Sequence, residues 1–157
     1  MAETSISVKD AAATTQNLAT QTISAKQYGG HWIKAVPEGG GTPYINLDVD
    51  ETGVVVKSSA GQLYGGLVFN LHGTTPSGLP TLFLKIYDKA TAPTSSDTPK
   101  YTLPIESGEP VPLGALFGPT GAAFANGIGL RCTMALAHAD TSAVPMANAC
   151  IVNLTYA

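Results

Sequence analysis

The fold is decided by residues 128–136, which read Ile-Gly-Leu-Arg-Cys-Thr-Met-Ala-Leu. Every second residue from Ile128 to Leu136 is apolar, and the residues between them are small, polar or charged. A period of two is typical of a β-strand that buries one face in a core. We therefore predict a strand here, with Cys132 pointing inward and Arg131 on the opposite face.

The same rhythm recurs at the end of the chain, where residues 150–156 read Cys-Ile-Val-Asn-Leu-Thr-Tyr. Residues 137–147 between the two stretches are polar and contain Pro145, which is typical of a loop. We predict that the two strands pair antiparallel across this long loop. Ile151 interrupts the alternation, and from it we expect the last strand to be covered on both sides.

Four further stretches are predicted to be strands. From alternation, residues 62–72 place Leu63, Leu67, Phe69 and Leu71 on one face, and residues 81–88 place Leu82, Leu84 and Ile86 inward. Residues 54–58 form a short strand, and residues 100–106 form one that Pro104 confines to an edge or a bulge. Short strands separated by Gly/Pro turns predict an all-β fold, an antiparallel β-sandwich or jelly-roll-like barrel.

Composition excludes several classes of protein. The chain has 157 residues, a formal net charge of -3 and 12% charged residues, about half the usual ~25%. Sparse Lys and Arg argue against nucleic-acid binding, which needs a basic surface. No apolar run reaches the ~18 residues of a membrane-spanning helix. We therefore expect neither nucleic acid nor a membrane among the partners.

The domain boundary is predicted at residues 37–43, Pro-Glu-Gly-Gly-Gly-Thr-Pro. Residues 44–157 hold the predicted strands and form the sandwich domain. Residues 1–36 have too few large apolar side chains to fill a core of their own. We expect this segment to be an extended arm or strand-adding segment that lies on the sandwich, on a neighbouring subunit or on another protein. The predicted anchors of the arm are Ile6, Val8, Leu18 and Trp32.

Motifs for chemistry are weak. Asp48-Val-Asp50-Glu51-Thr52-Gly53 is similar to the start of a calcium loop, but the twelfth position is Ser59 instead of a bidentate Glu, so a solvated hairpin turn is the better interpretation. The three histidines, His31, His72 and His138, lack the spacing of a zinc site. We predict no catalytic residue, metal or cofactor, and therefore no enzyme.

The two cysteines, Cys132 and Cys150, fall on inward positions of their strands, so their sulfurs are expected to lie near one another. Residues 1–10 are polar and lack the basic start and apolar stretch of a secretory signal. We therefore expect the chain to fold in a reducing cytoplasm, with both cysteines as free thiols packed in the core.

Several stretches resemble small structural proteins of tailed bacteriophages. They are Ser7-Val-Lys-Asp-Ala-Ala-Ala-Thr-Thr-Gln-Asn-Leu-Ala-Thr20, the block from Leu82 to Pro99 with its Tyr-Asp-Lys-Ala-Thr-Ala-Pro core, and residues 124–130 and 140–156. The resemblance implies a virion component with a β-sandwich body and no catalytic residues. It does not distinguish the head of the particle from the tail.

Three functions follow as hypotheses. The first is a capsid decoration (cement) protein on the virion surface, made in the host cytoplasm and bound to the major capsid protein and to copies of itself as a homotrimer. The alternative is a tail or fibre component, either an adaptor or a host-recognition module. The third is a carbohydrate-binding or carbohydrate-cleaving sandwich with Tyr28, Trp32, Tyr44 and Tyr64 as a stacking platform and Glu38, Glu51, Glu106 and Glu109 as carboxylates.

Overall fold

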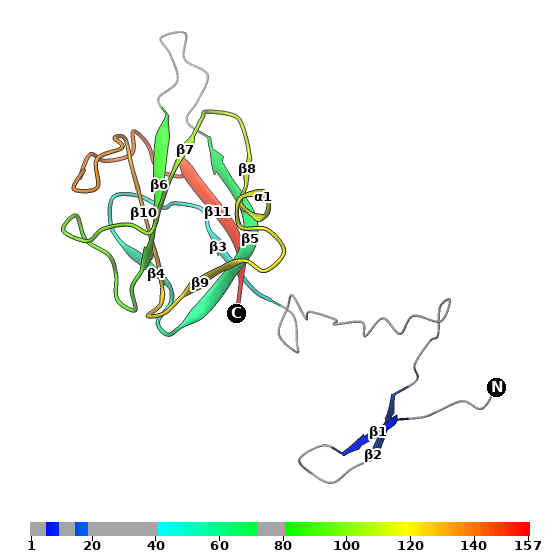
Figure 1. The fold of residues 1–157 in the computed structure, drawn as a ribbon. Coiled ribbons are helices and arrows are strands. Elements are labelled where there is room, and N and C mark those ends of the chain that lie inside the picture. Colours follow the sequence, from blue (N-terminus) through cyan, green and yellow to red (C-terminus); the bar gives the residue numbers. More distant parts are fainter. Residues whose placement is uncertain (1–5, 10–14, 19–40, 72–80) are drawn as a thin grey trace. The chain divides into compact units, whose positions relative to one another are not determined.

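The chain divides into two compact units, Met1–Ile33 and Lys34–Ala157. The computed structural model describes residues 6–9, 15–18, 41–71 and 81–157. In the first unit, β1 (Ile6–Lys9) pairs antiparallel with β2 (Thr15–Leu18). In the second unit, the described strands form two antiparallel sheets that pack face to face (Figure 1).

One sheet has four strands in the order β4-β10-β6-β7, namely β4 (Val54–Lys57), β10 (Ile128–Thr133), β6 (Leu82–Asp88) and β7 (Tyr101–Ile105). The other follows the order β3-β11-β5-β8, with β9 also paired to β5; its strands are β3 (Thr42–Asn46), β11 (Cys150–Tyr156), β5 (Gly61–Asn70), β8 (Val111–Pro112) and β9 (Ala122–Phe124). The predicted all-β sandwich is confirmed. Pro104 lies on an edge strand, β7, as predicted. A single turn of helix, α1 (Leu113–Phe117), follows β8 and was not predicted.

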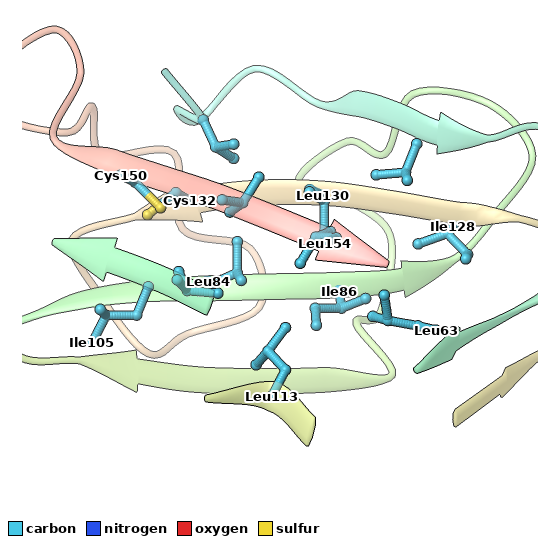
Figure 2. Packing of buried hydrophobic residues seen from close by; sticks show 14 of the residues in the cluster. Leu63, Leu84, Ile86, Ile105, Leu113, Ile128, Leu130, Cys132, Cys150 and Leu154 are labelled. Carbon is cyan, nitrogen blue, oxygen red and sulfur yellow. The ribbon is translucent and has the colours of Figure 1, made fainter. Parts of the chain in front are cut away.

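The core lies between the two sheets and is filled by alternate side chains of their strands (Figure 2). The four-stranded sheet contributes Leu82, Leu84, Ile86, Ile128, Leu130 and Cys132, and the other sheet contributes Leu63, Val68, Cys150, Val152 and Leu154. All of these side chains are fully buried. Each buried Leu or Ile contributes about 1.5–3 kcal/mol relative to exposure to water, so this cluster is the main source of stability.

The predicted pairing of the two C-terminal strands is wrong. β10 lies between β4 and β6, whereas β11 lies between β3 and β5 in the opposite sheet. β10 also ends at Thr133, earlier than predicted, and Leu136 is 62% exposed. The connection after β10 therefore crosses from one sheet to the other instead of closing a hairpin. Alternation identifies strands, but it carries no information about which strands pair.

A bulge in β5 changes which side chains face the core. Thr155 of β11 lies opposite Gly65, but the next residue, Tyr156, lies opposite Leu63, so the register shifts by one residue at Tyr64, just before the glycine pair Gly65–Gly66. Leu63 therefore points inward before the bulge, and Val68 points inward after it. The prediction that Leu63 and Leu67 share a face is wrong, because the bulge turns Leu67 outward, where it is 41% exposed.

The outer face of the four-stranded sheet is covered by the chain's own connections. All six residues of β10 are buried, including Arg131 and Thr133, which face away from the core. Pro93, in the connection after β6, packs so closely on this face that a β-carbon at Gly129 would lie 2.9 Å from its ring. This sheet is thus enclosed on both sides, whereas no described residue encloses the outer face of the five-stranded sheet.

Candidate functional site

The outer face of the five-stranded sheet carries large apolar side chains and no charged residue at its outward strand positions. We define the apolar face as the apolar or uncharged polar residues that point away from the core on β3, β11, β8 and the part of β5 after Gly66, together with Leu47 and Leu71, which continue the alternation just past two strand ends. Its members are Pro43, Ile45, Leu47, Leu67, Phe69, Leu71, Pro112, Ile151, Asn153 and Thr155.

Strand register aligns these side chains in rows. Asn153 on the central strand lies opposite Ile45 on one side and opposite Leu67 on the other. Leu67 in turn lies opposite Pro112 of β8. Because neighbouring strands are about 4.8 Å apart, this row runs continuously across the sheet. Ile151 and Phe69 form the next row.

The exposure of these side chains is unusual for a free surface. Ile45 is 62% exposed, Leu47 57%, Leu71 52% and Leu67 41%. Contiguous exposed apolar patches on soluble proteins typically mark interaction sites. The expectation that the last strand is covered on both sides is wrong within the described residues, because Ile151 is only half-buried and Asn153 is exposed.

Two glycines, Gly65 and Gly66, follow directly after the bulge of β5, where the strand begins to supply the apolar face. Gly66 has φ +136°, a backbone conformation that other residues rarely adopt. A β-carbon there would lie 2.0 Å from the carbonyl oxygen of Asn153. The backbone next to the bulge thus requires a residue without a side chain. After the bulge, Leu67, Phe69 and Leu71 point to the surface and Val68 fills the core.

The enclosed face of the other sheet provides a contrast, since its buried cations bind the chain's own carbonyl oxygens. Lys85 Nζ donates to the carbonyl of Ala137 at 2.6 Å. Arg131 donates from Nε to the carbonyl of Glu51 at 2.8 Å and from Nη2 to that of Asp140 at 3.1 Å. Burial lowers the pKa of Lys85, and the nearby Asp140 partly offsets this effect. These cations hold the connections in place and are not available to a ligand.

The Tyr-Asp-Lys-Ala-Thr-Ala-Pro block has a structural role as well. Asp88 accepts hydrogen bonds from the backbone N–H groups of Ala125, Asn126 and Gly127. Burial alone would raise the pKa of Asp88, but these three donors lower it. This carboxylate therefore fixes the turn between β9 and β10.

The loop after β6, within residues 82–99, is stabilised by contacts of Asp97. Lys89 Nζ lies 2.5 Å from the Asp97 carboxylate, which also accepts hydrogen bonds from the N–H and the hydroxyl of Thr94. The hydrogen bond from Lys89 is the main reason that the pKa of Asp97 falls to about 2. The loop that carries Pro93 onto Gly129 is thereby held closed.

Residues 48–53, which are similar to the start of a calcium loop, lie in the connection from β3 in one sheet to β4 in the other. They therefore do not form the hairpin turn that was predicted. Asp48 accepts a hydrogen bond from the N–H of Asn148, and Asp50 accepts one from that of Thr52. The two carboxylates line a shallow depression of about 260 Å³ together with Glu51, Ala143, Val144, Met146 and Ala147. Within the described ranges, no group of three or more His, Cys, Asp or Glu side chains is placed to bind a metal ion.

Other predicted residues are placed only in part. In the β1–β2 pair, Ile6 lies opposite Leu18 and Val8 lies opposite Gln16, and for these predicted anchors only the strand pairing is described. Trp32 lies outside the described residues, as do His31, His72, Tyr28 and Glu38. His138 is exposed.

The proposed stacking platform is not formed by the two tyrosines that can be placed. Tyr44 points toward the core and packs against it, whereas Tyr64 is half-buried and donates a hydrogen bond to Gln62 at 3.4 Å. Glu106 accepts hydrogen bonds from the hydroxyl of Thr81. Tyr44 and Tyr64 therefore do not present a shared stacking surface.

Comparison of the chain with protein-family models, with curated proteins and with solved structures finds no match. Among the residues that the structure describes, no helix is long and apolar enough to cross a membrane.

Proposed function

We propose that this protein is a non-enzymatic structural component of a bacteriophage particle, a decoration protein that binds the capsid shell through the apolar face. The observation that carries the proposal is the row Ile45–Asn153–Leu67–Pro112, an uncharged and largely apolar surface across the five-stranded sheet. Several sequence stretches resemble phage virion proteins, and this resemblance is the reason that we propose a phage capsid as the assembly.

The chemistry of the face defines the partner surface. Apolar burial contributes about 25 cal/mol per Å², and an uncharged face loses no ion hydration when it is covered. A complementary partner is therefore flat, apolar and uncharged at its centre. We propose that surface on the major capsid protein, with copies of this chain contacting one another as a homotrimer around a local symmetry axis of the shell.

The arm adds a second contact in this proposal. Ile6, Val8, Leu18 and Trp32 are the anchors predicted from the sequence, and an arm of this kind contacts its partner through main-chain hydrogen bonds and apolar pockets. In the full-length chain, Trp32→Ala should weaken binding to shells while leaving the urea midpoint of the sandwich unchanged. Wild-type binding by this variant would contradict the role of the arm.

Location in the particle tests the proposal. A reconstruction by electron microscopy of virions from the phage that encodes this chain should show hundreds of copies on the shell surface. A few copies on the tail would support the alternative, a tail or fibre component. A particle without the protein would refute both.

A further inference from the structure

Cys132 and Cys150 face each other across the sandwich. Cys132 lies on β10 and Cys150 on β11, in opposite sheets, and both side chains are fully buried. The two thiols are free, and neither is part of a disulfide. Figure 2 shows the two sulfur atoms next to one another at one end of the core.

The backbones of the two cysteines are tied to one dipeptide. Cys132 donates its N–H to the carbonyl of Asp50 at 2.7 Å, and Val49 donates its N–H to the carbonyl of Cys150 at 2.9 Å. Val49 and Asp50 are consecutive, so their Cα atoms are about 3.8 Å apart. The segment that passes from one sheet to the other thus holds both cysteine backbones at a corner of the sandwich. Packed sheets are elsewhere about 10 Å apart, a distance that a disulfide does not span.

Polar contacts fix the same end of the sandwich. Asn70 lies opposite Cys150 in the neighbouring strand. Its side-chain amide donates to the carbonyl of Ile105, in the other sheet, at 3.0 Å. The two sheets are therefore linked by hydrogen bonds on both sides of the thiol pair, which limits their relative movement and keeps the sulfurs together.

We propose that Cys132 and Cys150 form a redox-sensitive pair, which closes into an inter-sheet disulfide when the protein meets a low-molecular-weight disulfide such as oxidised glutathione. The thiolate of one cysteine attacks the oxidant, forms a mixed disulfide and displaces one glutathione thiolate. The other cysteine then attacks the protein sulfur of the mixed disulfide and displaces the second glutathione thiolate. Two protein thiols are oxidised, two glutathione thiols are produced, and their two protons balance the reaction.

The rate of this step depends on opening of the corner. The hydrogen bond with Cys150, together with burial, raises the pKa of the Cys132 thiol, so the reactive thiolate is scarce in the closed protein. The connection between the cysteines has an exposed outer side that includes Leu136 and Met146. We infer that local opening of this connection admits the oxidant, after which the disulfide fastens the connection to the sandwich. This inference does not depend on the proposed function.

Oxidation of the full-length protein tests the proposal. The wild-type protein is incubated with oxidised glutathione in buffer and in urea below the unfolding transition, and its intact mass and non-reduced peptides are measured. The expected product has lost two hydrogen atoms and contains one peptide that joins residues 132 and 150. It should form faster in urea, melt several degrees higher than the reduced protein, and return to the original Tm after dithiothreitol.

Cys132→Ser and Cys150→Ser are the matched controls, and each should yield a glutathione adduct without ring closure. Three results with the wild-type protein would overturn the proposal. They are two free thiols after oxidation in urea, a stable glutathione adduct in place of the cross-link, and a cross-linked product with an unchanged or lower Tm.

Discussion

Gly66 lies directly against Asn153, so that a β-carbon at position 66 would be 2.0 Å from the Asn153 carbonyl oxygen. This contact lies directly after the bulge that separates inward Leu63 from inward Val68 and turns Leu67 to the surface. The apolar face therefore depends on one close approach between two backbones.

Gly66→Ala should destabilise the fold by about 3 kcal/mol or more, because both the positive φ and the clash with backbone oppose it. Gly108→Ala is the matched control, since Gly108 has φ +78° and no atom within 4 Å of the added carbon. The control substitution should lower the free energy of unfolding by only about 1 kcal/mol. Urea unfolding followed by circular dichroism measures both, and equal losses would contradict the role of the clash.

Acid should lower the part of the protein's stability that comes from the contacts of Asp97 in the loop after β6. The pKa of this carboxyl is about 2 in the folded protein against an ordinary value of 3.8, so its contribution to stability is present above pH 3.8 and is lost as the pH falls toward 2. Asp97→Asn should cost about 1 kcal/mol at pH 6, because the Lys89 pair is partly exposed and screened.

Urea midpoints at pH 6, 4, 3 and 2 test this expectation. The difference between the wild-type protein and Asp97→Asn should shrink steadily below pH 4. Lys89→Met should remove most of the same pH dependence, because Lys89 provides the largest part of the pKa shift. A difference that stays constant from pH 6 to pH 2 would contradict the assignment.

Arg131→Met should destabilise the protein by about 3 kcal/mol. The substitution preserves much of the side-chain volume but leaves the carbonyl groups of Glu51 and Asp140 without this donor on an enclosed face. Lys57→Met, on the neighbouring strand, should cost less than about 1 kcal/mol, because Lys57 is only half-buried. Thermal unfolding distinguishes the two, and a loss for Arg131→Met no larger than for Lys57→Met would be inconsistent with a structural tether.

Most strands could be predicted from the sequence because alternation is a local property. Residues 128–133, 150–156 and 82–88 follow it and were predicted as strands with the correct inward residues. Strand partners could not be predicted in this way. The connection after β10 is long enough to close a hairpin or to cross the sandwich, and alternation is the same in both cases.

The candidate site was missed for a specific reason. Counting every second residue from Leu63 places Leu67 in the core, and this count fails at the bulge. A signal was present, since Gly65 and Gly66 interrupt the strand and an uninterrupted apolar run, Leu67-Val68-Phe69, follows them. In a strand with a bulge, the inward residues are odd-numbered on one side of the bulge and even-numbered on the other. A single period of two along the whole strand cannot describe this change.

The most direct test of the central claim is binding of full-length variants to shells assembled without this protein. Ile45→Lys combined with Leu67→Lys places two charges on the apolar face, and it should raise the Kd for shells by about 100-fold or more while leaving the urea midpoint near that of the wild type. Leu136→Lys combined with Leu116→Lys is the control, because Leu136 and Leu116 are 62% and 53% exposed and lie outside the face. The control should bind as the wild type does. Wild-type binding by Ile45→Lys/Leu67→Lys would contradict the assignment of the apolar face as the docking surface.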